Sequence, residues 1–165
     1  MKTIYFVRHA KSSWADASLP DHDRPLNARG KRDGPVMARR LLGLDVVPDG
    51  LLSSTAKRAK RTSKYFADVL AVPKDNRIYR RELYHAYPTR IEREIWTLPD
   101  EWNTVLLFGH NPGYTELAND LRGEGTIDNV PTCGIVGARA RIDDWSDFLL
   151  AEADRICFLY PKQTQ

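Results

Sequence analysis

Short runs of β-branched and aromatic residues alternate with longer helical patterns along this chain, and this alternation is what most constrains its fold. The clearest apolar runs cover residues 4–7 and 104–108, and both have the composition of strands buried on two faces. Further short strands are predicted at residues 51–52, 77–79, 134–140 and 156–160. Strands that alternate with helices favour an α/β layered fold with a largely parallel sheet.

Helical periodicity fills the stretches between these runs. Asn27 has the residue type of an N-cap, and Met37 and Leu41 follow with helical spacing. The Gly34-Pro35 pair interrupts this stretch, so a kink or a later helix start is predicted. Further helices are expected after a capping-type cluster at residues 53–55, at residues 89–98 and at residues 114–121.

Length and charge narrow the class of protein. The 165 residues correspond to a single domain, which we expect to span residues 1–165. Hydrophobic residues make up 42% of the chain and charged residues 28%, which excludes a disordered or collagen-like polymer. The 25 basic and 22 acidic side chains leave a net charge of +3. This charge is too small to predict a nucleic-acid partner or an acidic membrane.

Cysteine usage and the apolar runs indicate the compartment. Cys133 and Cys157 form neither a disulfide framework nor a CxxC metal pair, so we expect two buried free thiols in a reducing cytosol. The apolar run before Arg8 is too short for a signal-peptide core, and no run reaches 18 apolar residues. A cytoplasmic protein without a membrane partner is therefore predicted.

Cationic and imidazole side chains follow three of the predicted strands. Arg8 and His9 end the first strand, Arg58 comes after the strand at residues 51–52, and His110 comes after the strand at residues 104–108. Ligands bind at the carboxyl ends of strands in folds of this kind, so these four side chains are expected at one edge of the sheet. Two arginines and two imidazoles there would bind a doubly charged anion, and phosphate is the obvious candidate.

The same residue types suit phosphoryl transfer. A neutral imidazole nitrogen can attack phosphorus and form a phosphohistidine intermediate. Arginine forks and a second imidazole supply the donors that charged equatorial oxygens need. Ser12 and Ser13 offer further donors close to His9. No metal and no other cofactor is required by this set, and a cationic pocket would repel a divalent ion.

Three ordered motifs resemble the histidine phosphatase superfamily, which includes the phosphoglycerate mutases. VRHAKS at residues 7–12 is similar to its Arg-His-Gly signature, with Ala10 in place of the usual glycine. SSTAKRA at residues 53–59 resembles its Ser-Ser-Pro-x-x-Arg-Ala stretch, and GHNPG at residues 109–113 its second-histidine motif. The matches run from residue 3 to about residue 121. RHAKSSW, RPLNARGKR, ELYHA and GHNPG together are most similar to the SixA-type phosphohistidine phosphatase branch.

The resemblance implies a three-layer α/β/α sandwich and a role for each matching position. His9 corresponds to the nucleophile, Arg8 and Arg58 to phosphate clamps, and His110 to the second imidazole that contacts the phosphoryl group. Together with Ser12, the two arginines and His110 form the expected phosphate-binding set.

The proton donor is where the chain departs from its larger relatives. Those relatives carry a glutamate between the second arginine and the second histidine that protonates the leaving oxygen. Here the region reads RELYHA at residues 81–86, and the candidates for a proton donor are Glu82 and His85. A site without a dedicated acid suits a P–N bond, because imidazole is a far less basic leaving group than an alkoxide. Short connections also leave little chain for a lid over a small metabolite.

We therefore predict a metal-independent phosphatase that hydrolyses phosphohistidine, or another phosphoprotein or phosphoramidate, through a covalent intermediate on His9. One alternative is a phosphomonoesterase or mutase that acts on a small sugar or nucleotide phosphate. Another is a non-catalytic module that binds a phosphorylated partner. A dinucleotide loop is disfavoured, because GHNPG lacks the GxGxxG spacing.

Overall fold

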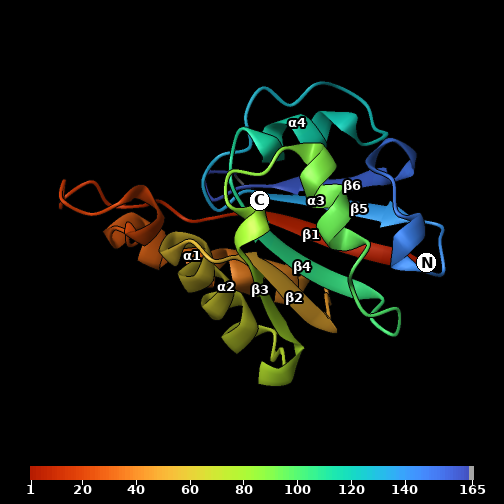
Figure 1. Ribbon diagram of the computed structural model, residues 1–165, viewed down its shortest axis with the longest axis horizontal. Helices are drawn as coiled ribbons and strands as arrows, with labels where there is room; N and C mark the ends of the chain where they lie inside the picture. The colour runs from red at the N-terminus through yellow and green to blue at the C-terminus, as the bar shows by residue number, and fades with distance from the viewer. Residues whose placement is uncertain (164–165) are drawn as a thin grey trace.

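The computed structural model describes residues 1–163 and arranges them around a six-stranded sheet with the strand order β3-β2-β4-β1-β5-β6 (Figure 1). The first four strands pair in parallel, whereas β5 runs antiparallel to both of its neighbours. The mostly parallel sheet predicted from the alternation is therefore confirmed. The strands are β1 (Lys2–Arg8), β2 (Gly50–Ser54), β3 (Arg77–Arg80), β4 (Thr104–Gly109), β5 (Ile135–Ala140) and β6 (Asp154–Leu159).

The antiparallel pairing of β5 with β6 has a simple reason. A parallel neighbour requires a crossover connection, usually an α-helix, whereas antiparallel neighbours can be joined directly. Between β5 and β6 the chain forms only two short 3-10 turns, at Trp145–Asp147 and Leu150–Glu152. The two strands consequently pair with each other in opposite directions.

Helices cover both faces of the sheet and give the three-layer α/β/α sandwich that the family resemblance implied (Figure 1). Helices α1 (Ala28–Gly43) and α2 (Lys57–Val69) lie on one face, and α3 (Pro88–Ile95) and α4 (Gly113–Asp120) lie on the other. Successive strand side chains point to opposite faces. Phe6 and Leu107 accordingly pack in the core with α3 and α4, while Val7 and Phe108 pack with α1 and α2.

Helix α1 begins where its N-cap predicts. The Asn27 side chain accepts a hydrogen bond from the backbone N–H of Gly30 at 2.9 Å. Pro35 lies inside a continuous helix, so the later start predicted from the Gly34-Pro35 pair is wrong. Gly34 has a packing role instead, because a Cβ at this position would lie 2.6 Å from the ring of Tyr65 on α2. The missing side chain lets the two helices approach closely.

Three local expectations change in the structure. Ser53 and Ser54 are the last residues of β2 and do not cap α2, whose N-cap residue Ala56 makes no side-chain capping bond. The helix predicted at residues 89–98 ends at Ile95, because the N–H groups of Thr97 and Leu98 bond three residues back in a tightened turn. Cys133 is buried as expected, whereas Cys157 is only half-buried.

Within the described part of the chain, no helix combines the length and apolar character needed to cross a membrane.

Candidate active site

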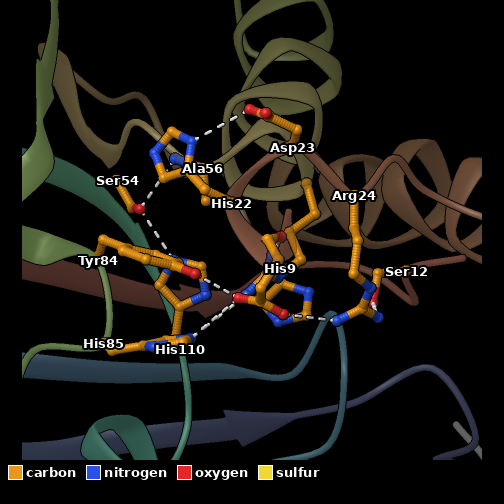
Figure 2. Close-up of polar contacts among 12 residues, drawn as sticks. His9, Ser12, His22, Asp23, Arg24, Ser54, Ala56, Tyr84, His85 and His110 are labelled. Atoms are coloured by element: carbon orange, nitrogen blue, oxygen red, sulfur yellow. Dashed lines mark hydrogen bonds and ion pairs between the residues drawn. The ribbon is translucent and has the colours of Figure 1, made fainter. Parts of the chain in front are cut away.

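The four candidate side chains converge at one edge of the sheet, as their positions after the strands predicted. Strands β1, β2 and β4 are neighbours and run in the same direction, so their carboxyl ends meet. Arg8, His9, Arg58 and His110 all line one pocket there, with a volume of about 310 Å³. Ser12 lines the same pocket. Figure 2 shows His9 between the ring of His110 on one side and Ser12 on the other.

His9 is held as a neutral imidazole with one free nitrogen. Its Nδ1 lies 2.7 Å from the backbone carbonyl oxygen of Ala10, which can only accept, so Nδ1 carries the proton. Burial, assisted by the charges of Arg58 and Arg8 and opposed by the bond to Ala10, lowers the pKa of His9 to about 3. Nε2 therefore keeps an unshared electron pair at neutral pH, as a nucleophile requires.

His110 stands beside His9 with a ring-centroid separation of 5.2 Å. Its Nε2 lies 2.8 Å from the Ser54 hydroxyl, which also accepts a bond from the N–H of Ala56. Burial and the neighbouring His9 and Arg58 lower the pKa of His110 well below its usual range, so its ring is neutral. We assign the Ser54 hydroxyl as the donor to Nε2, which places the proton of the ring on Nδ1. Nδ1 has no hydrogen-bond partner among residues 1–163, and it is buried.

Arg8 carries a second unpartnered nitrogen in the same pocket. Its Nη1 donates to the Val130 carbonyl oxygen at 2.9 Å, while its buried Nε has no partner within the described residues. Burial and the charge of Arg58 lower the pKa of Arg8 below its ordinary value. Buried polar groups without partners are rare, and a bound anion is one physical reason for them. An oxyanion in the pocket would accept from Arg8 Nε and from His110 Nδ1 at once.

The carboxylate of Asp21 lies in the pocket lining and pairs with two arginines there, Arg58 and Arg24. Asp21 lies in a 3-10 turn at Asp21–Asp23 and accepts hydrogen bonds from Arg58 and Arg24, each at 2.9 Å. The Tyr84 hydroxyl donates a further short bond to the same carboxylate. Partial burial favours the protonated form of Asp21, but the three hydrogen bonds outweigh it and hold its pKa well below the usual range. Asp21 is therefore an ionised acceptor at neutral pH.

Of the two candidate proton donors, only His85 lines the pocket. Its Nε2 lies 3.4 Å from Arg58 Nη2 and 3.5 Å from Asp21 Oδ2, and its ring stacks on Tyr84 with centroids 4.1 Å apart (Figure 2). The backbone of His85 is left-handed, with φ of 54°. Strained backbone of this kind persists only where the surroundings hold it, often at functional sites. Glu82 is exposed and does not line the pocket.

Sequence reasoning missed the side chains that surround the predicted set. Asp21, Arg24 and Tyr84 have no strand or helix periodicity around them, and their roles depend on which loops meet. Arg24 is buried, and it donates to the Ser12 hydroxyl and to Asp21. Its guanidinium also covers the exposed ring of Trp14 at 3.3 Å from the centroid. The RPL segment of the family-like motif was the one signal that pointed to Arg24.

The described residues contain no group of three or more histidine, cysteine, aspartate or glutamate side chains arranged to hold a metal ion.

The α/β/α fold and a cationic pocket at the carboxyl edge of its parallel strands define a protein that handles phosphorylated compounds. Residues 4–84 match the model of the histidine phosphatase superfamily (branch 1). An uncharacterised chloroplastic protein of Arabidopsis thaliana is 31% identical to this chain, over 88% of it and 70% of the relative. An uncharacterised protein of Mycobacterium leprae is 30% identical, over 94% of this chain and 100% of its own. The chain belongs to the histidine phosphatase superfamily and is a phosphatase.

Comparison with solved structures shows which branch of the superfamily this chain is similar to. A structure assigned as the phosphohistidine phosphatase SixA of Agrobacterium tumefaciens superposes with a TM-score of 0.80 and is 28% identical, over 97% of this chain and 98% of that one. The protein histidine phosphatase SixA complexed with tungstate has the same fold, with a TM-score of 0.78 and 23% identity over 95% and 96% of the two chains. Within the superfamily this chain is SixA-like.

Proposed function

We propose that this protein hydrolyses phosphohistidine, and that it does so through a covalent phosphohistidine intermediate on His9. The free Nε2 of His9 supports its role as the nucleophile, because its lone pair is not used in the hydrogen bond that fixes the ring in the cationic pocket. The unpartnered nitrogens of Arg8 and His110 support binding of a phosphoryl group. The substrate in this proposal is a phosphorylated protein, and the reaction needs no metal because arginines and imidazoles supply the charge.

We infer a P–N substrate bond from the ionisation of Asp21, the carboxylate in the pocket lining. Asp21 accepts from Arg58, Arg24 and Tyr84, and its low pKa leaves it without a proton to give at neutral pH. General acid help is worth about 10²–10⁴-fold for a basic leaving group. An alkoxide would receive no such help from this carboxylate. An imidazole that is already protonated on its other nitrogen leaves as a neutral ring and needs no such donor.

In each of the two steps, one bond to phosphorus forms while another breaks, and His9 Nε2 takes part in both. In the first, His9 Nε2 forms a bond to phosphorus and the P–N bond to the substrate imidazolium breaks, with the electron pair returning to the departing ring. In the second, water attacks phosphorus, the bond to Nε2 breaks, and the water proton passes to the phosphate product and solvent. The Nδ1 proton of His9 stays on its ring throughout, held by the Ala10 carbonyl.

Phosphate release tests this proposal. We would compare phosphoimidazole, an aryl phosphate and an alkyl phosphate as substrates of the wild type in excess EDTA. Turnover of the first two, with the alkyl phosphate at least about 10²-fold slower, is the expected result. Equal turnover of the alkyl phosphate would overturn the P–N preference and favour a phosphomonoesterase of small metabolites.

The covalent step has its own readout. Rapid quenching of the wild type with phosphorus-labelled phosphoimidazole should give a labelled, acid-labile protein. His9→Ala should give neither label nor turnover. Arg93→Ala removes an exposed cation on α3, on the opposite face of the sheet, and serves as the matched control. Full activity of His9→Ala would refute the intermediate.

A further inference from the structure

A second, larger groove adjoins the active-site pocket. It has a volume of about 720 Å³ and lies along the exposed side of α2 and the edge strand β3. Most of its charged side chains are basic, with Asp23 as the acidic exception in its lining. The basic residues come from α1, α2 and β3, and they are Lys31, Lys57, Lys60, Arg61, Lys64 and Arg77.

Most of this positive charge has no acidic partner. Of the six basic side chains, only Lys64 lies within ion-pair distance of a carboxylate, that of Asp68 at 3.1 Å, when all of residues 1–163 are considered. Lys60 instead covers the ring of Tyr79, at 4.9 Å from its centroid. Although the net charge of the chain is only +3, several cations without acidic partners among the described residues gather in this groove. Such a concentration attracts anions and speeds their arrival.

The groove and the pocket share a wall. Asp21 lines the pocket, and the next residue, His22, lines the groove. Likewise Arg58 lines the pocket, and the residue before it, Lys57, lines the groove. His22 is fixed in this wall by a 2.9 Å hydrogen bond between its Nε2 and the hydroxyl of Thr55. Consecutive Cα atoms are about 3.8 Å apart, so the two sites lie on either side of a wall about one residue thick.

The groove has the length of a short peptide segment. Lys57 and Lys64 are seven residues apart on α2, which corresponds to about 10 Å along the helix axis. An extended peptide rises about 3.3 Å per residue, so roughly three of its residues cover this row of cations. A small phosphorylated metabolite would fill the pocket and leave the groove empty.

We propose that the groove binds an acidic segment of the phosphorylated protein, within a few residues of its phosphohistidine. This inference rests on the proposed function and specifies its substrate class. Carboxylates of the partner would pair with the free lysines while the phosphohistidine enters the pocket. A nucleic acid fits less well, because single strands bind through stacked aromatic rings. The groove lining has one tyrosine, Tyr79, and the ammonium of Lys60 lies over one face of its ring.

Two phosphohistidine peptides test the proposal directly. The acidic peptide has three glutamates on each side of the phosphohistidine. The neutral peptide is identical except that serines replace these glutamates. For the wild type at low salt we expect a kcat/KM ratio of acidic to neutral peptide of about 10 or more, which falls towards 1 in about 0.5 M salt. The variant Lys60→Glu/Lys64→Glu should show a ratio near or below 1. The ratio removes any general loss of activity, since both peptides meet the same pocket.

The matched control reverses two charges elsewhere. Arg90 and Arg93 are exposed on α3, across the sheet from the groove, and Arg90→Glu/Arg93→Glu changes the net charge by the same amount. This variant should keep the wild-type preference. A wild-type ratio near 1, or an equal loss of preference in both variants, would overturn the inference while turnover of the neutral peptide still supports the proposed function.

A binding measurement covers the remaining outcomes. Fluorescence anisotropy of the unphosphorylated acidic peptide should show binding to the wild type and none to Lys60→Glu/Lys64→Glu. If neither phosphopeptide is hydrolysed, the proposed function fails, and retained binding by this variant would refute the groove as well. A single-stranded RNA octamer that displaces the acidic peptide at equal concentration would overturn the assignment in favour of nucleic acid.

Discussion

Asp21 and Arg58 are joined twice. The Arg58 guanidinium donates to the backbone carbonyl oxygen of Asp21 at 2.6 Å and to its carboxylate at 2.9 Å. The donors of the proposed phosphate clamp are thereby engaged by an internal anion. The same carboxylate also holds Arg24 and Tyr84 in place. If Arg58 binds phosphate as proposed, Asp21 both positions its guanidinium and competes with phosphate for it.

Replacing Asp21 by asparagine should tighten the binding of inorganic phosphate. The amide keeps the shape and an acceptor oxygen but removes the negative charge that competes for Arg58. We expect the inhibition constant of phosphate to fall about fivefold, the equivalent of about 1 kcal/mol for a partly exposed charge pair. Asp23→Asn, in the same turn but with no arginine within ion-pair distance among residues 1–163, is the control. Weaker phosphate binding by Asp21→Asn would mean that positioning outweighs competition.

Replacing Arg58 by alanine should lower affinity and rate together. Its side chain is buried at the pocket wall, and its planar fork matches the geometry of a phosphoryl group. Loss of one such donor costs about 10²–10³-fold in the rate of comparable enzymes. Arg58→Lys keeps the charge without the fork and should recover only part of kcat/KM. Steady-state kinetics with phosphoimidazole give the comparison, and wild-type values for Arg58→Ala would remove Arg58 from the mechanism.

His9 should not titrate in the range typical of histidine. Burial and the nearby arginines lower its pKa from 6.5 to about 3, so protonation that would block its proposed nucleophilic role occurs only at strongly acidic pH. A ¹³C NMR titration of ring-labelled histidines should find the His9 signal constant between pH 8 and 5 in the phosphate-free protein. A His9 midpoint near 6.5 would contradict this expectation.

The two buried histidines should make the fold sensitive to mild acid. Below about pH 6.5 the unfolded chain binds protons at both rings, while the folded chain keeps them neutral because both pKa values are lowered. Stability therefore falls as the pH falls from 6.5 towards the folded-state values, by on the order of 2 kcal/mol per ring at pH 5.

Urea unfolding at pH 7 and pH 5 measures this loss. His110→Gln, whose amide can still meet the Ser54 hydroxyl, should reduce the loss by about half because one of the two rings is gone. His22→Gln changes a histidine at the groove wall, outside the pocket, and is the matched control. An undiminished loss in His110→Gln would show that other groups cause the acid sensitivity.

Two glycines of α1 should respond oppositely to alanine. A Cβ at Gly30 would lie 2.2 Å from the backbone oxygen of Lys11, in the loop that lines the pocket, so Gly30→Ala must displace that loop. Overpacking of this kind costs about 1–3 kcal/mol. A Cβ at Gly43 would meet no atom within 4 Å, so Gly43→Ala should be neutral or stabilise the helix by up to about 1 kcal/mol. Urea unfolding of both variants provides the comparison.

The sequence alone determined the layered α/β fold and the four residues at the strand ends. Buried strands and helices have periodic patterns that can be read without coordinates. The rule that parallel strands end at one edge then places Arg8, His9, Arg58 and His110 near one another, and the structure brings these four into one pocket. The family-like motifs located the same positions independently.

Only the tertiary structure decided what surrounds those residues. Asp21 and Tyr84 are 63 positions apart, and they meet because two short 3-10 turns, at Asp21–Asp23 and Arg81–Leu83, pack at the same edge. Loops of this kind have no periodicity that predicts their contacts. The direction of β5, the continuity of α1 through Pro35 and the basic groove likewise depend on packing between distant segments. Local sequence patterns determine which segments form helices and strands. Contacts between residues far apart in the sequence determine the protonation states and the charges that line the site.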